Sequence, residues 1–190
     1  MRRFFARCLK YIVGAGLSLV VGTAWHEGVG HGLVGVLCGG HIVSMKVLGV
    51  QLRPTVRWVG RDSCYSQCDV QEISSPTGEH LCSLGGSLST WFVSVLAVLL
   101  LWVRDWPPRT RFLLAWLGIW WIDLLTYTWS SWGLRRCILW GALYSEPYEA
   151  AVALGIPGPV FQAFVVGTSA LLLVALAARL LAKRQGDQRP

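Results

Sequence analysis

Four stretches of the chain are apolar enough and long enough to cross a lipid bilayer. A transmembrane helix needs about 20 consecutive apolar residues, and the runs at 11–38, 83–103, 112–132 and 159–182 meet this requirement. Apolar residues make up 54% of the chain and charged residues only 14%, a composition that departs from that of soluble domains. We therefore expect an all-α integral membrane protein that forms a single membrane-embedded domain over residues 1–190, with about four transmembrane helices.

Basic residues gather at the ends of these apolar runs. Placing the N-terminus in the cytoplasm puts eleven Lys and Arg residues on the inner side of the membrane and six on the outer side. This agrees with the positive-inside rule, which the reverse orientation violates. We therefore predict a multi-pass protein with both termini in the cytoplasm. The same distribution accounts for the net charge of +7, so we expect the lipid bilayer as a partner and no binding of nucleic acid.

The first run contains an unusual group of polar side chains at residues 26–31, His-Glu-Gly-Val-Gly-His. Ionisable side chains are costly inside a bilayer and mark functional sites there. Two histidines that flank a glutamate are typical of zinc peptidases, in which the imidazoles bind the metal and the carboxylate activates a water molecule. We therefore interpret His26 and His31 as metal ligands and Glu27 as the general base. The alternative is a glycine-rich helix whose histidines only form hydrogen bonds to neighbouring spans.

The spacing of the two histidines does not suit a regular α-helix. Five steps at 3.6 residues per turn rotate the chain by roughly 500°, so the imidazoles would point about 140° apart and could not share an ion. A π-bulge adds one residue to a helical turn and is frequent at functional sites. Gly28 and Gly30 make such a distortion inexpensive because they have no side chains. We therefore predict a bulge at residues 27–31.

A zinc ion held by two histidines needs a third protein ligand. Asp123 is the only acidic residue in the predicted spans apart from Glu27. At about 1.5 Å per residue from the inner ends of the spans, His26 lies about 24 Å deep and Asp123 about 18 Å deep, so a tilt of either span brings them together. We expect Asp123 to be the third ligand. Glu146 and Glu149, in the next outer loop, are the alternatives, and Asp123 then accepts hydrogen bonds from side chains near it.

The outer segment at 39–80 separates the first two runs. It opens at Gly39-Gly40, which ends the first helix, and alternating apolar residues at 42–52 and 56–59 then predict a small β-hairpin at the membrane face. Such a hairpin either binds an extended peptide by strand addition or covers the site as a lid. Small residues at 83–90 open the second run and favour close packing of this span against the first.

Three cysteines follow the predicted hairpin. If the outer side is oxidising, we expect a disulfide between Cys64 and either Cys68 or Cys82. A second zinc site made of these three thiols and His80 is the alternative, although the spacing matches no common zinc module.

These features together resemble the site-2 protease class of intramembrane zinc metalloproteases. The resemblance lies in the histidine motif at 26–31, Gly39-Gly40 followed by strands, Gly85-Gly86 in the second run and an acidic residue in a later run, and it covers residues 20–130. In that family two histidines and a distant aspartate hold zinc, and the glutamate between the histidines is the general base. The resemblance implies these roles for the following residues: His26, His31 and Asp123 as ligands of Zn²⁺, and Glu27 as the base.

The resemblance also implies a function, which is hydrolysis of peptide bonds in or near the transmembrane segments of membrane-protein substrates. The chain departs from the family in two places. The family usually spaces its histidines by four residues, whereas the spacing of five occurs in the soluble dipeptidyl peptidase III type. The family also surrounds its aspartate with Asn, Pro and Gly, whereas Asp123 lies between Ile122 and Leu124.

Two other functions agree with the same residues. One is a non-catalytic membrane scaffold that keeps the metal site and binds the spans of other proteins. The other is a membrane protein that handles metal or haem through His26, His31 and His41. No pattern in the sequence indicates an oligomeric state.

Overall fold

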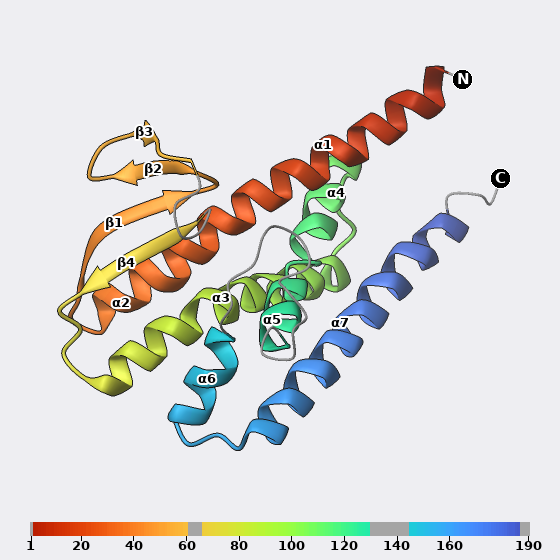
Figure 1. Cartoon of the computed structure of the whole chain (residues 1–190). Helices are drawn as coiled ribbons and strands as arrows, with labels where there is room; N and C mark the ends of the chain where they lie inside the picture. Colours follow the sequence, from red (N-terminus) through yellow and green to blue (C-terminus); the bar gives the residue numbers. More distant parts are fainter. Residues whose placement is uncertain (1, 61–65, 130–144, 187–190) are drawn as a thin grey trace.

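A computed structural model describes residues 2–60, 66–129 and 145–186 of the chain. These residues are mostly helical and include one small antiparallel sheet (Figure 1). The elements, in chain order, are α1 (Arg2–Trp25), the π-helical segment η1 (His26–Leu33), α2 (Val34–Leu37), β1 (His41–Val47), β2 (Val50–Arg53), β3 (Arg57–Trp58), β4 (Gln67–Gln71), α3 (Pro76–Val103), α4 (Pro108–Leu117), α5 (Trp121–Thr128), α6 (Glu146–Ala153) and α7 (Gly158–Gly186).

Three helical stretches of the described chain are long and apolar enough to cross a membrane. They are Tyr11–Leu37, which runs through α1, η1 and α2, then Pro76–Val103, and Gly158–Ala182. They agree with the first, second and fourth of the predicted spans. The start of α1 and the end of α7 lie at the same end of the molecule, and the sheet lies at the opposite end (Figure 1).

The predicted third span at 112–132 is not one helix. It divides into α4 and α5 at a turn where the amide of Ile119 donates to the carbonyl of Trp116 and that of Trp120 to the carbonyl of Leu117. Gly118 stands in this turn, where its low helix propensity favours a break. The last part of the predicted span, 130–132, lies outside the described residues.

Hydroxyl groups from other helices satisfy the backbone at this break. Ser94 of α3 donates to the carbonyl of Leu117 (3.1 Å), and Ser18 of α1 lies 3.5 Å from the carbonyl of Trp116. Both carbonyls also accept hydrogen bonds from backbone amides of the turn, so the hydroxyls add a second bond to each. These bonds connect the break to α1 and α3 and place α5 beside them.

The outer segment forms a small sheet, but the predicted strands are placed differently: a turn at Leu48-Gly49 divides the predicted first strand, 42–52, into β1 and β2, and only Arg57–Trp58 of the predicted second strand, 56–59, is a strand, β3. Four antiparallel strands pair in the order β3-β2-β1-β4. Leu48 and Gly49 connect β1 and β2, and both have a positive φ (49° and 82°), as tight turns between antiparallel strands require. The prediction omitted β4, which pairs with the other side of β1 and forms an edge of the sheet. Both β1 and β4 contact η1.

Helix α3 is the central element of the bundle. It packs against η1, α4, α5, α6 and α7. One buried cluster joins its C-terminal half to α4, α5 and α7, and a second joins its N-terminal half to α5, α6 and α7. The first cluster contains Ala97, Leu101, Leu114, Trp121 and Leu172, and the second contains Leu84, Leu124, Ala151, Phe161 and Val165.

The backbones of η1 and α3 touch where glycines face each other. A Cβ added to Gly30 would overlap the Cα of Gly86 and would lie 2.9 Å from the carbonyl oxygen of Gly85. Small residues allow this close approach of two apolar helices. The expectation that the small residues at 83–90 pack against the first span is confirmed.

Replacing Gly30 by Ala should destabilise the protein. The added methyl group would meet backbone atoms of Gly85 and Gly86, which cannot rotate away, and overpacking of this kind costs about 1–3 kcal/mol. We expect a lower midpoint of thermal unfolding for the purified protein in detergent. Gly16→Ala on α1 is the matched control, because a Cβ there meets nothing within 4 Å. Equal midpoints for the two variants would contradict this helix contact.

Candidate metal centre

The segment η1 brings the two histidines to one side of the helix. It is π-helical from His26 to Leu33, so the predicted distortion at 27–31 is confirmed and extends beyond that range. In a π-helix each hydrogen bond joins residues five apart, so His26 and His31 become neighbours along the axis. Their ring centroids are 4.8 Å apart, and the Nε2 atoms are 3.1 Å apart.

Each imidazole ring is oriented by a hydrogen bond at Nδ1. Nδ1 of His26 donates to Oδ2 of Asp123 (2.7 Å), and Nδ1 of His31 donates to the carbonyl oxygen of Cys82 (2.8 Å). Because both rings carry their proton on Nδ1, both Nε2 atoms present lone pairs to each other. Two lone pairs at 3.1 Å repel each other unless a cation lies beside them. Histidines that bind a metal through one ring nitrogen typically donate a hydrogen bond from the other, as both rings do here.

Glu146 completes a group of three candidate ligands. Its Oε2 lies 3.8 Å from Nε2 of His31, and one ligand atom from each of His26, His31 and Glu146 lies within 4.8 Å of the others. Glu146 begins α6, and the hydroxyl of Ser145 just before it donates to the carbonyl oxygens of Tyr127 and Thr128 (2.9 and 3.0 Å). The end of α5 therefore fixes the start of α6 and with it the position of Glu146.

Asp123 does not join this group, although the sequence favoured it as the third ligand. Its Oδ2 contacts Nδ1 of His26, on the opposite side of the ring from Nε2, and also accepts a hydrogen bond from the hydroxyl of Thr90 (3.0 Å). Asp123 thus orients a candidate ligand, and Glu146, one of the two alternatives, takes the place near the Nε2 atoms. Glu149 is exposed, and it is not in the group of candidate ligands found among the described residues.

Gly86 leaves the space that an ion would need. A Cβ at residue 86 would lie 2.6 Å from Nε2 of His26 and would contact Nε2 of His31. A zinc ion binds imidazole nitrogens at about 2.0–2.1 Å, so two such nitrogens must lie within about 4 Å of each other, and 3.1 Å satisfies this limit. The two histidines, the carboxylate and the glycine gap therefore fit a divalent metal ion.

Glu27 follows His26 in η1 and is 4% exposed. Burial raises the pKa of the Cys68 thiol on β4 to about 12, and the negative charge of Glu27 contributes to this increase. The charge of the predicted base therefore acts on a thiol of β4. His41 is remote from this group, since it is exposed and lies 3.4 Å from the exposed Glu72.

The cysteines form no metal site within the described residues. Cys68 and Cys82 are free thiols, and the group His26, His31 and Glu146 is the one set of three or more candidate ligands found among those residues. Cys64, the expected disulfide partner, lies outside them. The hydroxyl of Ser145 and the carbonyl of Cys82 are the positioning groups that the sequence did not reveal, because their roles depend on contacts between distant segments.

Zinc affinity should separate the roles of Glu146 and Asp123. Glu146→Gln removes a candidate ligand, so we expect a large loss of affinity in competition with a chelator of known affinity. Asp123→Asn keeps an acceptor for His26 but removes the negative charge of the side chain. Changing a group that orients a metal ligand typically lowers metal affinity about 10–100-fold. Glu149→Gln, at an exposed position, is the matched control. A greater loss for Asp123→Asn than for Glu146→Gln would reverse the two assignments.

The Cys68 thiol should react slowly with maleimide and show a strong pH dependence. A pKa raised from 9.0 to about 12 lowers the thiolate fraction near pH 8 about a thousandfold, and the thiolate is the reactive form. We expect the rate to rise tenfold per pH unit up to that pKa, as measured for this residue by mass spectrometry. Glu27→Gln should accelerate the reaction, whereas Glu72→Gln is the control. A rate that levels off near pH 9 in the folded protein would contradict the placement of this thiol.

Comparison with known proteins gives no match for this chain. No family model, curated protein or solved structure matches it. The centre consists of the convergent imidazoles of His26 and His31, the carboxylate of Glu146 beside them, and Glu27 in the same helical segment as the two histidines.

Proposed function

We propose that this chain is an intramembrane zinc metalloprotease, which hydrolyses peptide bonds in or near the transmembrane segments of other proteins. One observation carries the proposal. The Nε2 atoms of His26 and His31 converge to 3.1 Å with Glu146 beside them, next to a buried glutamate in the motif position of a general base. Two histidines and one glutamate are a ligand set of catalytic zinc sites, which leave one position open.

Each residue of the centre has a separate role in this proposal. His26, His31 and Glu146 would hold the metal, and Asp123 and the Cys82 carbonyl orient the two rings. Bound zinc supplies Lewis acidity, which activates water and polarises a carbonyl group. Glu27 accepts the proton of the attacking water and delivers it to the leaving amine, as general bases of this type do. Glu146 thus replaces Asp123 in the ligand set that the family resemblance implied.

In this proposal water reaches the centre beside Glu146. The Glu146 side chain is 40% exposed, compared with 11% for that of His31, so the carboxylate borders an accessible opening. The edge strand β4 contacts η1, and an edge strand can bind an extended peptide through its backbone. We propose strand addition on β4, with a lid over the site as the alternative role of the sheet. We further propose the orientation with both termini in the cytoplasm and the sheet on the outer side.

The geometry favours this function over haem binding. A haem ligated by both histidines would have to place its macrocycle between nitrogen atoms that are 3.1 Å apart. His41, the further ligand considered for haem, pairs with Glu72 at the surface. The scaffold alternative uses the same centre without chemistry, so it is distinguished from the protease by activity alone.

Replacing Glu27 by Gln should abolish proteolysis and preserve zinc binding. Loss of a general base typically lowers the rate by about 10²–10⁴-fold, and Gln keeps the size of the side chain. The purified protein is reconstituted with zinc in liposomes that contain a panel of single-span membrane proteins, and new N-termini are quantified by mass spectrometry. Glu72→Gln, in which the exposed Glu72 is replaced, is the matched control.

The outcomes discriminate between the two functions. New N-termini that require zinc and disappear in Glu27→Gln support the protease. Cleavage that persists in Glu27→Gln overturns the assignment of the base. Stoichiometric zinc without any cleavage by the parent protein favours the scaffold.

A further inference from the structure

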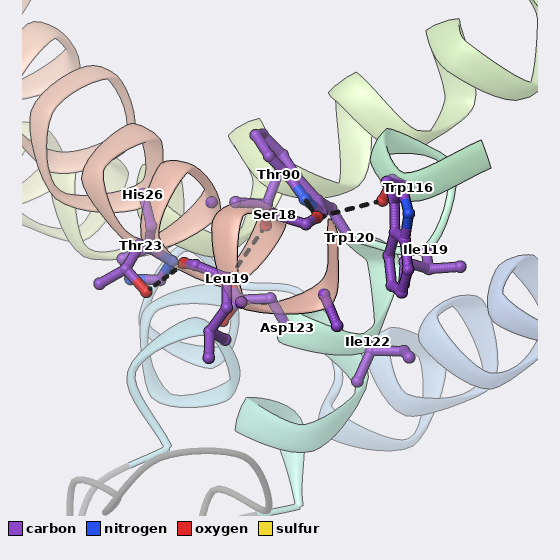
Figure 2. A pocket seen from close by; sticks show the side chains of 13 residues that line it. Ser18, Leu19, Thr23, His26, Thr90, Trp116, Ile119, Trp120, Ile122 and Asp123 are labelled. Atoms are coloured by element: carbon purple, nitrogen blue, oxygen red, sulfur yellow. Dashed lines mark hydrogen bonds and ion pairs between the residues drawn. The ribbon is translucent and has the colours of Figure 1, made fainter. Parts of the chain in front are cut away.

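A cavity of about 330 Å³ lies between α1 and the segment that contains the α4–α5 break. Figure 2 shows the side chains of α1 and of the segment 116–123 around it. Its lining along the first helical stretch begins at Ala15 and ends at His26. At about 1.5 Å per residue the cavity therefore extends over roughly 16 Å, and its volume is typical of a small-molecule site.

One end of the cavity reaches the surface and the other end is buried. Ala15 and Gly16 are exposed, whereas His26 and Thr90 are each 2% exposed. A Cβ at Gly16 would meet nothing within 4 Å, so there is free space at the exposed end. Large apolar side chains form the walls between the two ends, namely those of Leu19, Trp116, Ile119 and Ile122. An apolar chain that enters beside Gly16 would gain van der Waals contacts along these walls.

The size of the cavity suits one alkyl chain. A polypeptide helix is about 10–12 Å across and would need several times this volume over the same length. The exposed end opens within Tyr11–Leu37, a stretch that is long and apolar enough to cross a membrane, so a lipid chain can enter directly from a bilayer. At the buried end, Oδ2 of Asp123 already accepts hydrogen bonds from His26 and Thr90. A terminal methyl group does not compete for these bonds.

An arginine lies beyond the exposed end of the cavity. Arg109 precedes Phe112 by three residues and Trp116 by seven, so the three share one face of α4. This face is directed at α1, because the ring of Phe112 lies 5.8 Å from that of Tyr11 and a Cβ at Gly14 would meet Phe112 and Trp116. Arg109 is exposed, and its side chain forms no hydrogen bond or ion pair within the part of the chain that the structure describes.

The surroundings of Arg109 favour an anion. Helix α4 contains no acidic residue, and none precedes Glu27 in the chain, whereas four of the first ten residues are basic. Asp105, in the turn before α4, forms an ion pair with Arg179 (2.7 Å). Tyr11, which α4 contacts, begins the candidate span, so Arg109 lies at the level where the headgroups of a bilayer begin. A guanidinium group binds phosphate through two parallel hydrogen bonds.

We propose that the protein binds one anionic phospholipid, with its phosphate at Arg109 and one acyl chain along α1 in the cavity. The arginine selects the charged headgroup and the apolar walls accept the chain. A zwitterionic lipid with the same chains makes the same apolar contacts but carries no net negative charge. Lipid binding requires neither metal nor hydrolysis, so this inference stands apart from the proposed protease activity.

Photoaffinity labelling of the metal-free protein in phosphatidylcholine liposomes tests the site. The probe is phosphatidylglycerol with a diazirine at the end of one acyl chain, and phosphatidylcholine with the same modified chain is the comparison. We expect labelled peptides from residues 15–26 and 116–123, with severalfold more labelling by the phosphatidylglycerol probe. Equal labelling by the two probes overturns the proposal.

Gly16→Leu tests the position of the acyl chain. The substitution places a side chain in the cavity, and we expect labelling of these peptides by both probes to fall about tenfold, since a filled cavity excludes the chain. Gly167→Leu is the matched control, because Gly167 is exposed on α7, a Cβ there also meets nothing within 4 Å, and the residue does not line the cavity. Labelling that is unchanged in Gly16→Leu overturns the proposal.

Arg109→Gln tests the position of the headgroup. We expect the preference for the phosphatidylglycerol probe to fall about fivefold, the effect of one basic residue at an anionic membrane surface, while labelling by the phosphatidylcholine probe stays the same. Arg53→Gln is the matched control, since Arg53 is an exposed residue of the sheet. A preference that persists in Arg109→Gln, or that falls equally in the control, overturns the proposal. A protein that binds no zinc but is labelled as expected would lose the proposed protease function and keep the lipid site.

Discussion

The two imidazole rings of the centre are held by hydrogen bonds at the nitrogen atoms that face away from it. A carboxylate of α5 holds one ring and a backbone carbonyl of α3 holds the other. These two bonds fix the protonation pattern that makes both Nε2 atoms acceptors, and they need α3 and α5 at defined distances from η1. The glycine contact between η1 and α3 provides the first distance. The break between α4 and α5, with its carbonyls bonded to serines of α1 and α3, provides the second.

The sequence predicted those features that depend on local spacing. The separation of His26 and His31 by five residues required a π-helical turn if the two were to cooperate, and the structure has this turn. The lengths of the apolar runs predicted the three helical stretches that are long and apolar enough to cross a membrane. In each case the deciding quantity was a periodicity that can be counted along the chain.

The sequence did not reveal features that depend on contacts between distant segments. Asp123 was favoured as a ligand because a buried carboxylate and a metal both need a partner, but depth along a span cannot tell which nitrogen of His26 it meets. Glu146 was only an alternative in the sequence analysis. Its position depends on the hydrogen bonds from Ser145 to the end of α5, which spacing along the chain does not show. The break at Gly118 was hidden within an apolar run whose composition suits a continuous helix, since the stabilising hydroxyls come from other helices.

The hydrogen bonds from Ser145 to the end of α5 have a mechanical consequence. They join two short helices, one carrying Asp123 and the other beginning with Glu146. The two carboxylates therefore sit on one small body that touches the imidazole pair from both sides. A displacement of this body would release the orienting contact and the candidate ligand in a single movement, so the centre would be assembled or dismantled as a unit and not one residue at a time.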